Sequence, residues 1–278
     1  MTKVLLVPLV LLAAALVGLV VLARVLEPRL AFHPVPGGGE TPADFGVGYR
    51  DLVVTTGDGE RLHAWLLPRD DALAQVLYFH GNGGNLAGWA PVLAGLHRRG
   101  FEVLALDYRG YGHSTGRPSE RGLYRDAEAF VRLFASELRR PGVPVVYWGR
   151  SLGCAPAARA ARIEPPDGLV LESGFARGRD VFRGDPVLSF LGLFASYRFD
   201  TAALLQGVNR PTLVIHGDRD VVVRFEEGER LFRAIRSPKR FHRVPGGGHN
   251  DAEPREPEAY WNTVVGFVVD LREGRAGG

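Results

Sequence analysis

The chain alternates short apolar runs with stretches of helical periodicity. Five of these runs are almost continuously apolar, as is typical of strands that are buried on both faces of a sheet. The predicted strands are 75–80, 101–107, 144–149, 167–173 and 211–217, with 239–245 as a further strand. Helical stretches between them are expected at 86–99, 120–139, 152–162, 225–236 and 256–271. Such alternation predicts an α/β fold with a mostly parallel sheet covered by helices on both faces.

Two further segments precede this pattern. Residues 49–56 and 61–68 carry apolar and β-branched side chains and flank a Gly-Asp-Gly turn at 57–59, so they predict a β-hairpin. Polar clusters follow the later strands at 80–85, 216–220 and 246–251. Because functional residues of such sheets lie at the carboxyl ends of the strands, these clusters are candidates for a site.

The N-terminus is uniformly apolar. No charged residue occurs from Val4 to Ala23, and a helix of this length is about 30 Å long, the thickness of a bilayer core. We predict an uncleaved single-pass anchor. The alternative is a signal peptide, although its apolar core usually spans only about 7–15 residues. Lys3 before the run and Arg24 and Arg29 after it are closely balanced, so the membrane side stays open.

The expected domain organisation follows from these patterns. Residues 1–28 form the anchor, 29–46 a Pro/Gly-rich tether, 47–272 the catalytic domain and 273–278 a flexible tail. The net charge of +3 gives no indication of nucleic-acid binding. Cys154 is the single cysteine, which excludes an intrachain disulfide and a cysteine-based zinc site.

Ser151 is the candidate nucleophile. It lies in Gly149-Arg150-Ser151-Leu152-Gly153, a G-x-S-x-G sequence between a predicted strand and a predicted helix. In that context the sharp turn projects the serine hydroxyl above the sheet, and the two glycines allow the strand and helix to approach closely. A chance match of G-x-S-x-G is the alternative, so the motif needs partners.

A base and an acid should follow the nucleophile in the order Ser, Asp, His. His249 lies after the last strand in a glycine-rich loop, and we expect it to be the base. Asp218 and Asp220 are both candidates for the acid that orients it. We favour Asp220, because it lies further into the loop and Asp218 can hold the turn.

The oxyanion site requires backbone N–H groups. The N–H after the nucleophile belongs to Leu152, and the glycine-rich stretch 80–85 offers the N–H of Asn82. A phosphate-binding role for 80–85 is the alternative, but no Gly-Lys-Ser/Thr follows it. No metal or organic cofactor is implied.

These motifs together resemble the α/β-hydrolase superfamily, and more narrowly its membrane-anchored "α/β-hydrolase domain-containing" serine hydrolases. The resemblance spans about residues 30 to 272 and rests on FHGNGGN, DYRGYGHSTGRPSE, GRSLG, HGDRDVVV and GGGHND. It implies the α/β-hydrolase fold, with Ser151 as nucleophile, Asp220 as acid and His249 as base. Arg224 departs from the family, which often has proline there.

The expected function is therefore a membrane-anchored serine hydrolase that cleaves carboxylic esters or thioesters through an acyl-enzyme. Its partners would be an acyl ester, as a small molecule or lipid, and the membrane. A short lid is expected between Phe175 and Leu205, where the apolar stretch 187–197 is a candidate acyl-binding wall. The alternatives are a serine peptidase or amidase with the same triad, and a non-catalytic membrane-tethered scaffold.

Overall fold

The computed structural model of the chain describes residues 2–182, 186–192, 194–251 and 257–276. Eight strands form its central sheet, in the order β10-β9-β8-β7-β4-β6-β3-β2. Their bounds are β2 Arg50–Thr55, β3 Arg61–Leu67, β4 Ala74–Phe79, β6 Phe101–Leu106, β7 Val145–Arg150, β8 Gly168–Glu172, β9 Thr212–Gly217 and β10 Lys239–Val244. Strand β3 runs antiparallel to both of its neighbours, and the remaining pairs are parallel.

The predicted α/β-hydrolase fold and the predicted hairpin are both confirmed. Strands β4, β6, β7, β8 and β9 are buried along their whole length, because helices cover both faces of the sheet. β2 and β3 pair antiparallel from Arg50 opposite Leu66 to Thr55 opposite Arg61. β2 lies at the sheet edge and has mostly polar or exposed side chains.

Two separate apolar cores lie on the two faces of the sheet. One contains buried side chains of α3 (Glu120–Leu133), α4 (Cys154–Ala161), α6 (Thr201–Leu205) and α7 (Phe225–Ala234). The other contains those of α2 (Leu86–Arg98) and α9 (Pro257–Arg272). The bounds of α2, α4, α7 and α9 agree within a few residues with the predicted helices. Helix α6 was not predicted, and α3 passes into a π-helical turn, η2, at Phe134–Leu138.

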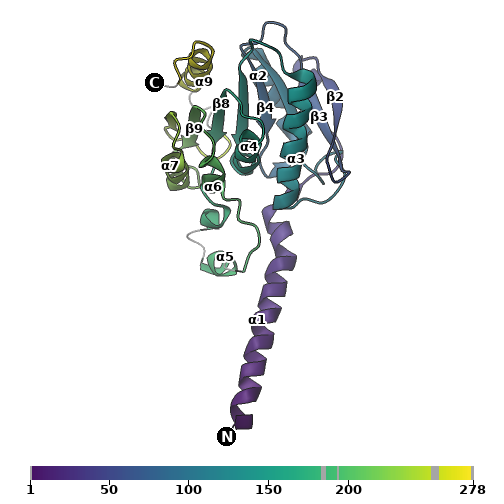
Figure 1. The fold of residues 1–278 in the computed structure, drawn as a ribbon, viewed down its shortest axis with the longest axis vertical. Coiled ribbons are helices and arrows are strands. Elements are labelled where there is room, and N and C mark those ends of the chain that lie inside the picture. Colours follow the sequence, from purple (N-terminus) through teal and green to yellow (C-terminus); the bar gives the residue numbers. More distant parts are fainter. Residues whose placement is uncertain (1, 183–185, 193, 252–256, 277–278) are drawn as a thin grey trace.

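The N-terminal helix α1 (Thr2–Ala31) projects from the domain as a single rod (Figure 1). Its stretch Pro8–Ala31 is long and apolar enough to cross a membrane. Among the described residues of α1, those that are buried lie in its last turns: Ala23 and Glu27 are buried, and so is Phe32 directly after the helix. Phe32 packs edge-on against Tyr197 at 5.5 Å between ring centroids.

The chain after α1 is bound to the domain where the sequence led us to expect a tether. Strand β1 (His33–Pro34) pairs in parallel with β5 (Gly83–Gly84), and η1 (Pro42–Phe45) is a short 3-10 helix. Asn85 adds side-chain hydrogen bonds from its Nδ2 to the carbonyl oxygens of Val35 (3.2 Å) and Gly37 (2.9 Å). The boundaries of the tether and of the catalytic domain stay a prediction.

Two short elements lie between β8 and α6, where the sequence predicted a lid. They are η4 (Gly178–Phe182) and α5 (Pro186–Leu191), and α5 lies on the side of the domain from which α1 projects (Figure 1). At the other end of the chain, the expected flexible tail is described as far as Ala276. There the backbone N–H of Arg275 donates to the Asp270 carbonyl at 2.8 Å.

Candidate active site

The turn at Ser151 has the strained backbone of a nucleophile elbow. Ser151 follows β7 directly and has a φ of +52°, a region that side chains other than glycine rarely adopt. A Cβ at Gly153 would lie 2.0 Å from the Phe79 carbonyl oxygen, and one at Gly149 would lie 2.6 Å from the Cys154 Cα. Both glycines are therefore required for α4 to approach β4 and β7 this closely.

The structure brings together the three residues that the sequence singled out. His249 Nε2 lies 3.0 Å from Ser151 Oγ, and His249 Nδ1 lies 2.7 Å from Asp220 Oδ2. With a hydrogen on Nδ1, the imidazole donates to Asp220, and its Nε2 accepts the hydrogen bond of the serine hydroxyl. This arrangement can remove a proton from Ser151 and hold it on the ring. The catalytic roles themselves stay a prediction.

Asp220 is set up to remain a carboxylate. Its Oδ1 accepts backbone N–H groups from Val222 (2.9 Å) and Val223 (2.8 Å), and its Oδ2 lies 3.4 Å from His216 Nε2. Burial alone would raise the pKa of Asp220, but the hydrogen bonds from His216 and His249 outweigh this effect and hold the pKa below its usual range.

The alternative acid, Asp218, points elsewhere. Its Oδ2 pairs with Arg243 Nη2 at 2.8 Å, and its Oδ1 accepts the N–H of Gly246 at 2.7 Å. The Arg243 guanidinium and the Gly246 N–H lower the pKa of Asp218. Asp218 thus holds the turn that leads into the His249 loop, the role that the sequence left open for it.

Arg150, which the sequence analysis passed over, holds the backbone of His249. Its Nη2 donates to the His249 carbonyl oxygen at 2.6 Å, and its Nη1 pairs with Glu172 Oε1 at 3.0 Å. Glu172 Oε2 in turn accepts hydrogen bonds from Trp148 Nε1 and Tyr260 OH, each at 3.1 Å. Strands β7 and β8 each end in a charged residue, but the sequence does not show that the two residues lie opposite each other.

The predicted oxyanion residues, Asn82 and Leu152, line the same cavity as Ser151 and His249. The loop that carries Asn82 is fixed by the Tyr111 hydroxyl, which donates to the Asn82 carbonyl at 2.8 Å. The use of the two N–H groups as an oxyanion site stays a prediction.

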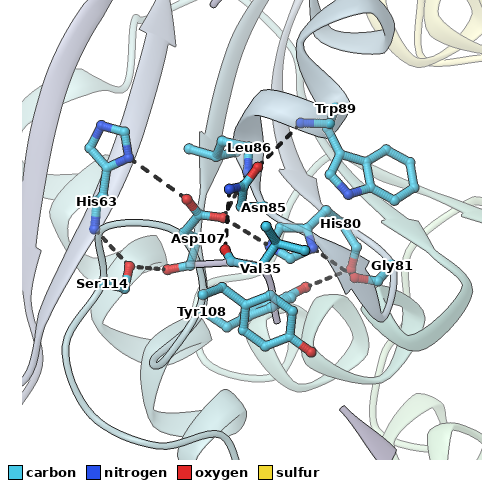
Figure 2. Close-up of polar contacts among 12 residues, drawn as sticks. Val35, His63, His80, Gly81, Asn85, Leu86, Trp89, Asp107, Tyr108 and Ser114 are labelled. Atoms are coloured by element: carbon cyan, nitrogen blue, oxygen red, sulfur yellow. Dashed lines mark hydrogen bonds and ion pairs between the residues drawn. The ribbon is translucent and has the colours of Figure 1, made fainter. Parts of the chain in front are cut away.

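The buried carboxylate of Asp107 contacts residues at both ends of the loop that carries Asn82. Figure 2 shows Asp107 between His63 and His80. Its Oδ1 accepts the N–H of Leu86 at 2.8 Å, and its two oxygens lie 3.6 Å from His80 Nε2 and 3.7 Å from His63 Nδ1. A Cβ at Gly112, in the loop after β6, would lie 2.0 Å from Asp107 Oδ2, so position 112 requires glycine.

The cavity above Ser151 has a volume of about 580 Å³. Its walls are mainly apolar, which is usual for sites that take small organic molecules. One wall comes from the predicted lid, with Gly192, Ala195 and Tyr197 among its lining residues. Among the described residues, no group of three or more His, Cys, Asp or Glu side chains is placed to hold a metal ion.

Comparisons with known proteins concern the sequence and the fold of the chain. The sequence model of the family described as "alpha/beta hydrolase fold" matches residues 75–182. An uncharacterized protein of Mycobacterium tuberculosis is 35% identical over 247 residues, which is 88% of each chain. An uncharacterized membrane protein of Saccharomyces cerevisiae is 29% identical over 238 residues, 83% of each chain.

A solved structure has the same fold. An esterase of Pyrococcus furiosus superposes with a TM-score of 0.70 at 22% identity, covering 86% of this chain and 99% of the esterase. At this level of identity the likeness concerns the fold and carries no information about the substrate.

Proposed function

Because this chain belongs to the α/β-hydrolase superfamily, we propose that it is a serine hydrolase that cleaves carboxylic ester or thioester bonds. One observation carries the proposal: the unbroken hydrogen-bond chain from Ser151 through His249 to Asp220, at a strained turn on a cavity wall. Such an arrangement has a cost in backbone strain that packing alone does not explain.

In the proposed reaction, Ser151 Oγ attacks the acyl carbonyl carbon while His249 Nε2 takes the hydroxyl proton. Asp220 keeps the proton of the imidazole on Nδ1 and stabilises the cation that forms. The N–H groups of Asn82 and Leu152 donate to the oxyanion of the tetrahedral intermediate. His249 returns the proton to the leaving alcohol or thiol, and water then releases the acid from Ser151 by the same steps in reverse order.

We further propose that α1 is a retained membrane anchor. Its length and apolar composition support this, as does the name of the yeast relative. The contacts of Ala23 and Glu27 with the domain also support retention, because cleavage after Ala23 would remove part of a packed surface. Figure 1 places the rest of the helix clear of the domain, where a bilayer can surround it.

The proposal is tested by hydrolysis assays on the full chain in detergent micelles. A p-nitrophenyl ester and the matching p-nitroanilide distinguish an esterase from an amidase. We expect the ester to be cleaved at least about a hundredfold faster than the anilide, and Ser151→Ala to abolish both rates. Ser136→Ala, at an exposed serine after α3, serves as the control. Equal rates on ester and anilide would favour the amidase, and no turnover of either would contradict the proposal.

A further inference from the structure

The last turns of α1 present one continuous face to the active-site cavity. The lining residues from this helix are Ala23, Leu26, Glu27, Leu30 and Ala31. Their spacing of three and four residues places them on a single stripe of the helix. The same cavity is lined by Ser151 and His249, so the stripe and the candidate nucleophile share one space.

This face of the helix is fixed against the domain by a polar clamp. Glu27 is buried, and its Oε1 accepts the backbone N–H of Tyr197 at 2.5 Å. Its Oε2 accepts the hydroxyl of Ser196. The carboxyl group thereby uses its hydrogen-bonding capacity on the lid, and it leaves the neighbouring side chains of α1 to form an apolar wall.

The residues that follow α1 are hydrogen-bonded to the predicted oxyanion loop, residues 80–85. After Phe32, strand β1 pairs with β5, which lies directly after Asn82. The Val35 N–H donates to the Gly84 carbonyl at 2.9 Å. The position of α1 and the position of the predicted oxyanion loop are therefore linked by backbone hydrogen bonds.

The α1 wall also lies at the level where a bilayer would end. The uncharged stretch of the helix stops at Ala23, the first residue of the cavity stripe. On α5, which lies on the side of the domain from which α1 projects (Figure 1), Phe190 is 51% exposed. Phenylalanine and leucine are typical of helix faces that lie in a membrane interface.

We propose that α1 is a substrate-binding element as well as an anchor: the alkyl chain of a bilayer-resident lipid ester lies against Leu26 and Leu30 while its carbonyl reaches Ser151. This inference rests on the proposed function. The alkyl chain enters the cavity from the side of the domain from which α1 projects. Leu26 and Leu30 provide no charge or hydrogen bond for the alkyl chain, so this part of the wall selects substrates by chain length.

The test compares a short and a long ester on the full chain in phosphatidylcholine nanodiscs. The probes are p-nitrophenyl acetate and p-nitrophenyl palmitate, and the readout is the ratio of kcat/KM for palmitate to that for acetate. Leu26→Trp and Leu30→Trp place a larger side chain in the cavity and displace several methylenes of a long alkyl chain. We expect each to lower the ratio about tenfold or more. Leu26→Ser, which cannot overpack, should lower the ratio as well.

Val25→Trp is the matched control. Val25 neighbours Leu26 on the same helix, is 58% exposed and does not line the cavity, so its ratio should stay within about twofold of the wild type. Unchanged ratios in all three cavity variants, or an equal fall in Val25→Trp, would overturn the inference.

The same experiment distinguishes a failure of the proposed role of α1 from a failure of the proposed hydrolase function. If the wild type hydrolyses both esters and the palmitate-to-acetate ratio of kcat/KM is the same in the α1 variants, only the proposed role of α1 is wrong. If the wild type hydrolyses neither ester, the proposed function itself fails. Fluorophosphonate labelling of Ser151 in each variant checks that the site is folded, and Leu26→Ser replaces any tryptophan variant that does not label.

Discussion

The histidine–carboxylate pairs His249–Asp220 and His80–Asp107 differ in what the second ring nitrogen contacts. In the first, His249 Nδ1 contacts Asp220 and its Nε2 contacts the Ser151 hydroxyl at 3.0 Å. In the second, His80 Nε2 lies 3.6 Å from Asp107, and its Nδ1 lies 2.7 Å from a backbone carbonyl. The first pair can move a proton to and from a reacting atom. The second can only hold a loop.

Burial separates the pairs further. The His249 side chain is 12% exposed and reaches the cavity, whereas that of His80 is fully buried. The His80 ring lies 4.4 Å from the ring of Tyr108, between centroids, and burial lowers the pKa of His80. A histidine beside a carboxylate is therefore a candidate base only when its other ring nitrogen faces a nucleophile and its ring is accessible to solvent.

Exchanging each carboxylate for its amide gives the largest difference between the pairs. Asp220→Asn no longer fixes the tautomer of His249, and we expect kcat to fall about 10⁴-fold. Asp107→Asn keeps an oxygen that can accept the Leu86 N–H. It should therefore lower kcat only through loop position, by at most about a hundredfold. Steady-state kinetics on one ester measure both, and equal losses would contradict the distinction.

Removing the contact that holds the His249 backbone should have an intermediate effect. Arg150→Met deletes the hydrogen bond to the His249 carbonyl and leaves Glu172 buried without its cation. We expect kcat to fall about ten- to a hundredfold, together with a loss of stability of about 3 kcal/mol.

The double variant Arg150→Met, Glu172→Gln separates these two effects. It removes the uncompensated charge, so the stability measured by denaturant unfolding should recover in part. The loop contact is still missing, and kcat should therefore stay low. Recovery of both quantities would show that Arg150 serves stability alone.

The smallest expected effect concerns the two histidines that face Asp107. The Asp107 carboxylate, and to a lesser extent Asp51, raises the pKa of His63 against the opposing effect of burial. The raised pKa means that His63 stabilises the fold below the ordinary histidine pKa of about 6.5, and this contribution is lost as the pH rises through the folded-state pKa. For His80, with its lowered pKa, stability is instead lost as the pH falls.

Thermal unfolding of His63→Gln measures this contribution. The difference in Tm from the wild type should be larger near pH 5.5 than near pH 9, by about 1–3 °C. NMR titration should show His63 with a midpoint above the ordinary value and His80 with one below it. A difference in Tm that grows with pH would contradict the assigned sign.

The three residues of the predicted triad could be recognised in the sequence because each lies in a short motif directly after a predicted strand. Ser151, Asp220 and His249 each follow a strand in an order that the fold requires, so a parallel sheet brings them to one edge. Arg150 and Glu172 became recognisable only from the register of β7 and β8, in which they lie opposite each other. That register is a long-range property, and the single motif around Ser151 does not contain it.

The role of α1 shows the same limit more strongly. Its apolar pattern predicted a membrane helix, and the Pro/Gly-rich residues after it predicted a tether. Neither pattern contains the contact of Glu27 with Tyr197, which joins positions 170 residues apart. The composition of α1 therefore indicated its apolar character and approximate length but not the surface that its last turns share with the cavity.

Fluorophosphonate labelling shows whether Ser151 is an activated nucleophile. The full chain in detergent micelles would be treated with a fluorophosphonate, and the modified residue mapped by mass spectrometry. We expect one label on Ser151, lost in Ser151→Ala, slowed strongly in Asp220→Asn and retained in Asp107→Asn. A folded protein that takes no label on Ser151, or takes it equally fast without Asp220, would contradict the account.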